Sequence, residues 1–198
     1  MMSLAKLCKT TARNVWALAL LCPVLTTSCL ADVVDDAIQP SAVNVKPARP
    51  NVVIILLDDV GFAASEVFGG AIKTPALDEL AGEGVRFNRF HTTGICSPTR
   101  ASLLTGRDAH RANVGAVMNS ASAISGYQGM LNPQTATIAS MLQQAGYATA
   151  AFGKWHLTPA WETTPAGPFT RWPTSLGFDK FYGFLGGETD QFAPTLYE

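Results

Sequence analysis

A continuous apolar run early in the chain constrains the fold more than any other feature. The segment 51–57 is apolar after its first residue and rich in β-branched side chains. It is too short for a typical helix and too uniform for a strand with one exposed face. The run therefore predicts the central strand of a parallel sheet, buried on both faces, and with it an α/β fold.

Two carboxylates follow this predicted strand directly. Asp58 and Asp59 stand at its carboxyl end, the edge at which open α/β sheets bind ligands. Adjacent carboxylates raise each other's pKa unless a cation lies between them, and hard divalent cations prefer oxygen ligands of this kind. From the residues alone, a metal site and a solvated Asp-Asp turn are both open.

A short helix is predicted between Ser97 and Gly106. Ser97 suits the N-cap, Pro98 the first helical position and Gly106 the stop. Cys96 would then lie just before the positive end of the helix dipole, which attracts anions. Arg100, in the first turn, can hold a tetrahedral oxyanion with two donors. The segment indicates a site for a sulfate or phosphate group, although a lone cysteine is more often inert packing.

Helices and strands alternate through the rest of the folded part. A helix is expected from Thr74-Pro75 to Gly82 or Gly84; the other expected elements are a strand at 85–90, a helix at 135–145 and a strand at 147–152. The last two favour a βαβ crossover. Lys154 and His156 follow that strand and would share one face of an extended chain, unless they belong to a solvated loop. His91 is interpreted as structural, whereas His110 has a position from which it can face the pocket.

Several of these segments resemble the type I sulfatases. Cys96–Arg100 resembles the C-x-P-[S/T]-R signature of that family, and Leu103–Arg107 its L-L-T-G-R tail. Residues 50–61 resemble the family's P-N-(apolar run)-D-D-x-G opening. The remaining matches are T-P-x-L-D-x-L-A at 74–81, G-K-W-H at 153–156, and a block of bacterial arylsulfatases at 176–198. We expect that block to border the pocket or to pack in the core.

The resemblance implies a fold and a chemistry. The fold is an alkaline-phosphatase-like α/β sandwich with a central, mostly parallel sheet. A maturation enzyme would oxidise Cys96 to Cα-formylglycine, and Asp58, Asp59 and the group at position 96 would bind Ca²⁺ or Mg²⁺. Arg100 and Lys154 would contact the sulfuryl oxygens of a small-molecule sulfate ester. His156 would act near the departing alcohol, so that Cys96, Arg100, Lys154 and His156 form the expected catalytic set.

The family's members are much longer than this chain. The resemblance therefore implies the N-terminal part of a catalytic domain, with an incomplete sheet and an incomplete metal shell, and we expect weak or no catalysis from it. Three alternatives stay open: a phosphonate or phosphate monoester hydrolase, a non-catalytic secreted remnant that binds an anion or a partner, and a cysteine hydrolase. The last needs a base and an orienting partner for the thiol.

The amino terminus has the pattern of a secretory signal. Residues 1–31 combine a basic start, an apolar stretch at 15–25 and small residues before Asp32. The apolar stretch is too short to span a membrane, and a buried N-terminal helix is the alternative. We expect a secreted or periplasmic protein; Cys29 suits lipoprotein anchoring less well, because Thr26 stands where leucine is usual. Residues 32–49 are expected to be a linker, followed by the domain at 50–198.

Charge and cysteine content narrow the function further. The formal net charge of −1 leaves no basic excess of the kind that binds nucleic acid. The chain has four cysteines, three of them within the first 31 residues. Cleavage after Ala31 would leave Cys96 alone and unable to form a disulfide within the chain. A chemical role is therefore the more economical interpretation of Cys96.

Overall fold

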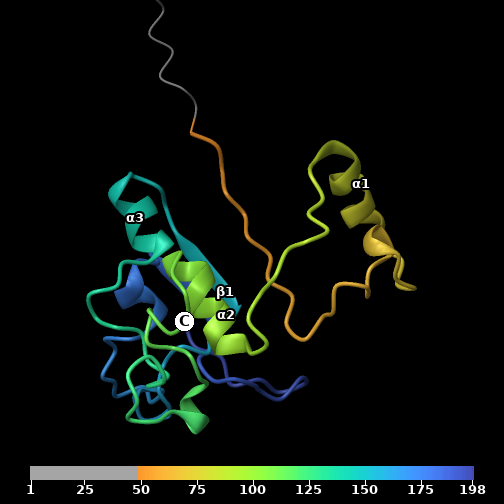
Figure 1. The fold of residues 1–198 in the computed structure, drawn as a ribbon. Coiled ribbons are helices and arrows are strands. Elements are labelled where there is room, and N and C mark those ends of the chain that lie inside the picture. The colour runs from red at the N-terminus through yellow and green to blue at the C-terminus, as the bar shows by residue number, and fades with distance from the viewer. Residues whose placement is uncertain (1–48) are drawn as a thin grey trace, which may run out of the picture. The chain divides into compact units, whose positions relative to one another are not determined.

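The computed structural model describes residues 49–198 (Figure 1). The predicted signal sequence, the three cysteines within it and the linker up to residue 48 lie outside the described residues. The chain divides into two compact units, Met1–Ile54 and Ile55–Glu198. The described part of the first unit, residues 49–54, contains no helix or strand. Within residues 49–198, no helix is long and apolar enough to cross a membrane.

The second unit contains three α-helices and two strands within the described residues. The helices are α1 (Pro75–Glu83), α2 (Cys96–Thr105) and α3 (Ile138–Gln144), and the strands are β1 (Ala150–Lys154) and β2 (Lys180–Phe184). Four short 3₁₀ segments, η1 to η4, cover Glu66–Phe68, Met118–Ser120, Ala160–Glu162 and Pro173–Leu176. The protein is thus α/β within the part described.

Several helix ends follow local signals in the sequence. The prediction for α1 is confirmed at both ends, since Pro75 opens it and Gly84 caps it. Helix α3 is shorter than predicted because Thr137 forms a capping box with Ser140, which starts the helix after residue 137. Gly106 ends α2 in the left-handed conformation, with φ of 63°, as the sequence predicted.

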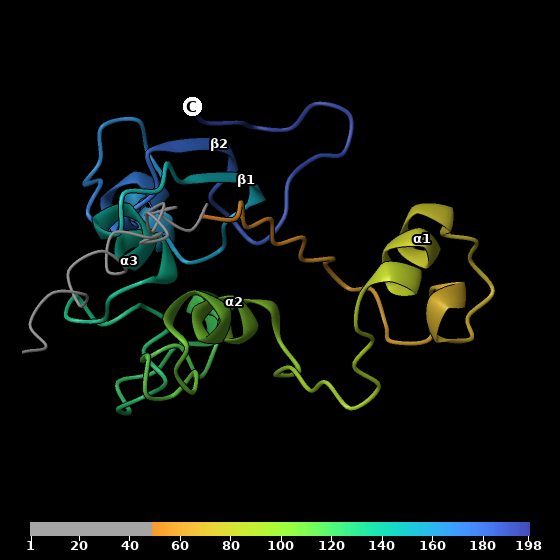
Figure 2. The ribbon, with the colours of Figure 1, turned by 90° about the horizontal axis from the view of Figure 1, so that it is seen from above.

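The sheet consists of two parallel strands. Strand β1 pairs with β2 in a register that runs from Ala150↔Lys180 to Lys154↔Phe184 (Figure 2). Residues 155–179 connect them through η3 and η4, as a parallel pair requires a long crossover. The predicted strand at 147–152 is present but begins later, at Ala150. Strand β2 was not predicted, because aromatic residues and glycines interrupt any alternation there.

Two predicted strands are wrong. Segment 51–57 forms no strand, and Val53 and Ile55 are 81% and 75% exposed. Segment 85–90 forms no strand either, and Val85 is 79% exposed. A central strand buried on both faces needs a pairing strand at each edge and a packed layer on each face. The described sheet has only β1 and β2, and neither pairs with these segments.

The hydrophobic core lies around α2 and the two strands. Trp155, which follows β1, packs edge-on against Phe178 and Phe181. The fully buried Ala101 of α2 and Leu185, which follows β2, belong to the same cluster. This core packs the carboxyl ends of the strands against α2.

The two strands approach most closely at a pair of glycines. Gly153 of β1 is in register with Gly183 of β2. A Cβ atom at Gly183 would lie 2.0 Å from the carbonyl oxygen of Gly153, a contact with backbone that no rotamer change relieves. Only glycine therefore fits at position 183, immediately before the strand ends that carry the site.

We expect Gly183→Ala to separate the strands and to lower the free energy of unfolding by about 2 kcal/mol or more, as overpacking does in a tight interior. Urea unfolding measures this. Gly186→Ala is the control, because the nearest atom to its Cβ would be 3.5 Å away. Equal stability of the two variants would contradict the close packing of the strands.

Candidate active site

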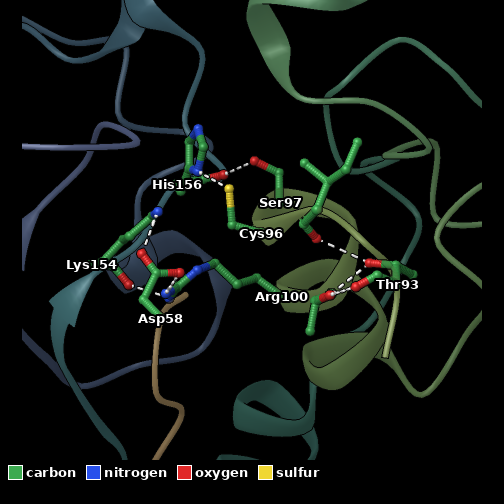
Figure 3. A network of polar contacts seen from close by, with 9 residues as sticks. Asp58, Thr93, Cys96, Ser97, Arg100, Lys154 and His156 are labelled. Atoms are coloured by element: carbon green, nitrogen blue, oxygen red, sulfur yellow. Dashed lines mark hydrogen bonds and ion pairs between the residues drawn. The ribbon is translucent and has the colours of Figure 1, made fainter. Parts of the chain in front are cut away.

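Polar side chains from three separate segments meet near the amino-terminal end of α2. Asp58 comes from the loop after the apolar run, and Cys96 and Arg100 come from the first turns of α2. Lys154 ends β1, and His156 follows it. Figure 3 shows these five side chains directed toward one another. The structure therefore brings together every residue predicted from the sequence for catalysis, together with Asp58.

Asp58 lies between two cations. Its Oδ2 accepts a hydrogen bond from Lys154 Nζ at 2.6 Å, and its Oδ1 accepts one from Arg100 at 3.4 Å (Figure 3). The Lys154 hydrogen bond, more than any other interaction, holds the pKa of Asp58 below its ordinary value; partial burial opposes this and the Lys154 and Arg100 charges assist it. Arg100 also donates to the Lys154 carbonyl at 2.6 Å, which ties α2 to the end of β1.

Cys96 and His156 are in direct contact. The Cys96 Sγ atom lies 3.1 Å from His156 Nδ1. Next to it, the buried Ser97 hydroxyl donates to the His156 carbonyl at 2.8 Å. These two contacts fix the imidazole against the first turn of α2 (Figure 3).

The predicted start of the Cys96 helix needs correction. Ile95, not Ser97, is the N-cap, and Cys96 is the first helical residue rather than the residue before the helix. The Ser97 hydroxyl is engaged with the His156 carbonyl, so it does not cap the helix. Cys96 still stands at the positive end of the helix dipole, where backbone N–H groups lack intrahelical partners.

The backbone at His156 is not extended, contrary to prediction. Its φ of 57° is left-handed, so the side chain leaves the strand direction that Lys154 still follows. Lys154 therefore contacts Asp58 while His156 contacts Cys96. The two side chains reach the same cluster by a turn rather than by sharing a face of a strand.

The His156 imidazole is neutral at neutral pH. Partial burial, first of all, and then the positive charges of Lys154 and Arg100 lower the pKa of His156 from 6.5 to about 4, and the Asp58 carboxylate opposes them. A neutral ring next to position 96 can accept a proton there. At neutral pH the ring is therefore in the form that accepts a proton, and its low pKa makes it a weak base.

The predicted metal ligands have suitable chemistry but are too few. Asp58 and Asp59 offer the hard oxygens that Ca²⁺ and Mg²⁺ prefer. Asp59 is exposed, with φ of 55°, and the Asp58 oxygens are held by Lys154 and Arg100. No group of three or more His, Cys, Asp or Glu side chains in residues 49–198 is arranged to hold a metal ion. These residues therefore fit part of a cation shell and would need further ligands.

The roles of two residues in the site were not predicted from the sequence. Ser97 orients His156 through its carbonyl. Gly187, after β2, lies so close to the imidazole that a Cβ atom there would be 2.6 Å from Nε2. The only signal in the sequence for Gly187 was the glycine-rich, aromatic block at 176–198, which was expected to border the pocket. His91 is exposed, and His110 contacts Asp108 and Tyr127 instead of the Cys96 cluster.

A cavity of about 910 Å³ adjoins His156. Residues of η3 and of the segment after β2 contribute to its lining. Both expectations for the block at 176–198 are therefore met. Residues 184–190 border this cavity, and Phe181 and Leu185 belong to the hydrophobic core.

Acidification from pH 6.5 to about 4 should destabilise the fold through His156. Over this range the unfolded chain takes up a proton at this histidine and the folded chain does not, so stability is fully present above pH 6.5 and falls toward pH 4. Nitrogen chemical shifts of the ring should report a neutral imidazole down to about pH 5. His156→Gln assigns the signal and should lose this part of the acid decline. A midpoint near 6.5 in the folded chain would contradict the burial of the ring.

Comparison with known proteins identifies the family. The sulfatase family profile matches residues 50–198. An uncharacterised sulfatase of Schizosaccharomyces pombe is 40% identical over 152 residues, which cover 73% of this chain and 26% of that protein. An arylsulfatase of Klebsiella aerogenes is 36% identical over 146 residues, which cover 73% of this chain and 30% of that protein.

The structure is similar to solved proteins as well. A protein solved in complex with its substrate, D-glucosamine-2-N,6-O-disulfate, is 33% identical with a TM-score of 0.50, over 68% of this chain and 23% of that one. This chain spans less than a third of the length of each of these relatives, and the similarity to arylsulfatases lies in the N-terminal part of those proteins. Its fold matches the alkaline-phosphatase-like sulfatase structures over that part. The chain belongs to the sulfatase family.

Proposed function

We propose that this chain provides the nucleophile side of the active site of a sulfuric ester hydrolase of the arylsulfatase type, with formylglycine at position 96. The observation that supports this most is the contact network that joins Cys96 to His156 and Arg100 to Lys154 at the amino-terminal end of α2. Membership of the sulfatase family supports the reaction class. The natural substrate would be a small-molecule sulfate ester.

In this proposal, some residues bind the sulfuryl group and another transfers a proton. Arg100 and Lys154 would donate to the sulfuryl oxygens and stabilise the charge that develops on them. Arg100 Nε is buried and has no hydrogen-bond partner among the described residues, so it is a free donor for such an anion. His156 would accept a proton at Nδ1 from the group at position 96 and return it to the departing alcohol.

Two absent groups would complete the chemistry. The hydrated aldehyde at position 96 supplies a nucleophilic hydroxyl and a second hydroxyl through which sulfate is released, whereas serine or cysteine lacks the second. Ca²⁺, or alternatively Mg²⁺, held by Asp58, Asp59 and the group at 96, would lower the pKa of the attacking hydroxyl. Both assignments rest on the family and on the types of residue present.

The domain division and the location in the cell belong to the same proposal. Residues 50–198 would form the N-terminal part of the catalytic sandwich, with β1 and β2 as two strands of its central, mostly parallel sheet. Residues 1–31 would direct the protein to the periplasm or outside the cell. A maturation enzyme would modify Cys96. The match of the family profile from residue 50 supports this boundary.

We expect Cys96 to be converted when the chain is coexpressed with a formylglycine-generating enzyme. Mass spectrometry of the peptide that carries residue 96 should show the thiol replaced by an aldehyde, which aldehyde-specific labelling confirms. Cys96→Ala is the control and should give no label. A thiol that persists while a known sulfatase is converted in the same cells would contradict the proposal.

The converted chain alone should turn over 4-nitrophenyl sulfate weakly or not at all. Asp58, Asp59 and the group at position 96 supply fewer oxygens than the six to eight that Ca²⁺ takes. Release of 4-nitrophenolate with and without added Ca²⁺ measures this, with Cys96→Ala as the blank. Robust turnover would show that these residues suffice, and faster hydrolysis of a phenyl phosphonate than of the sulfate would favour the phosphonate alternative.

A further inference from the structure

The cavity beside His156 has a mixed apolar and polar lining that the proposed chemistry does not use. Trp161 of η3 lines it with 59% of its surface exposed, and the partly buried Phe184 adds apolar surface. An exposed indole face next to another aromatic side chain is suited to a flat ring. The volume of about 910 Å³ is within the range of small-molecule sites.

The charges on this cavity are all of one sign. Glu188 and Asp190 contribute carboxylates to its lining, and among the described residues that line it there is no lysine or arginine. Asp190 accepts hydrogen bonds from the Phe192 and Ala193 amides at 2.8 and 2.7 Å. These bonds lower the pKa of Asp190 and keep it ionised at neutral pH. The cavity is therefore negative.

The His156 ring separates this cavity from the cationic cluster. Its Nδ1 lies 3.1 Å from Cys96 Sγ, and Gly187, which belongs to the cavity lining, packs against Nε2. Arg100 and Lys154 do not line the cavity. A ligand with its anionic end at Arg100 would thus extend past the imidazole into a negative environment.

We propose that the cavity receives the alcohol part of the sulfate ester against Trp161, and that Glu188 and Asp190 select against alcohols that carry a second negative charge. This inference rests on the proposed function, because it places the sulfate at Arg100 and Lys154. The substrate class is then a ring-bearing ester with one sulfate and a neutral or cationic alcohol. The solved relative mentioned above binds a disulfated sugar, which this lining would repel.

The test compares three esters that share one ring and differ only in charge. Phenyl sulfate, 4-carboxyphenyl sulfate and 4-(trimethylammonio)phenyl sulfate are titrated calorimetrically into the full chain at neutral pH and low ionic strength. We expect the carboxylate to bind about tenfold more weakly than phenyl sulfate, from two like charges within a Debye length, and the cation to bind at least as well as phenyl sulfate.

Variants assign the discrimination to the two carboxylates. Glu188→Gln with Asp190→Asn should reduce the difference to about twofold, because only the long-range field remains. Glu188→Gln alone keeps the Asp190 turn intact and should give an intermediate ratio. Glu79→Gln with Glu83→Gln on the exposed face of α1 makes the same change of net charge away from the cavity, and should leave the ratio at the wild-type value.

The outcomes separate this inference from the proposed function. Arg100→Gln should weaken all three esters alike if the sulfate binds there. Equal affinities for the three esters, with binding still dependent on Arg100, would overturn the charge selection and leave the proposed function standing. Binding that does not depend on Arg100, or no binding of any ester to the wild-type chain, would overturn both.

Discussion

The ion pairs of Asp58 with Lys154 and Arg100 hold the site together. Exposed ion pairs stabilise proteins little on their own, but here one carboxylate joins a loop, a helix and the end of a strand. The Arg100 hydrogen bond to the Lys154 carbonyl adds a backbone link that does not depend on Asp58. The relative positions of Cys96 and His156 follow from this link, since each lies within four residues of one partner.

The Asp58 carboxylate is also proposed to bind a divalent cation, so its ion pairs would compete with that cation. A divalent cation at Asp58 would compete with Lys154 and Arg100 for the same two oxygens. The displaced side chains would be free to donate to a sulfuryl group next to position 96. In the proposed function, cation binding and sulfate binding would therefore support each other: the metal takes the carboxylate, and the anion takes the two cationic side chains.

Local signals were readable from the sequence, and long-range partners were not. Gly106 and Pro75 predicted helix ends correctly, because each acts within its own few residues, whereas Ser97 did not cap α2. The strand at 51–57 failed because burial on two faces depends on neighbours elsewhere in the chain. Strand β2 was not predicted, because its pairing with β1 involves a close approach at Gly183 that no hydrophobic periodicity indicates.

The site shows the same division between residue identity and geometry. The motifs predicted the catalytic residues that the structure brings together, since cysteine, arginine, lysine and histidine have recognisable chemistry. They did not indicate that Ser97 would bind the His156 carbonyl or that Gly187 would pack against the ring. Both depend on the left-handed backbone at His156, which turns the imidazole toward α2. With the ring partly buried there, its low pKa follows from desolvation and two neighbouring cations. The neutral imidazole thus lies between a cationic cluster and an acidic cavity.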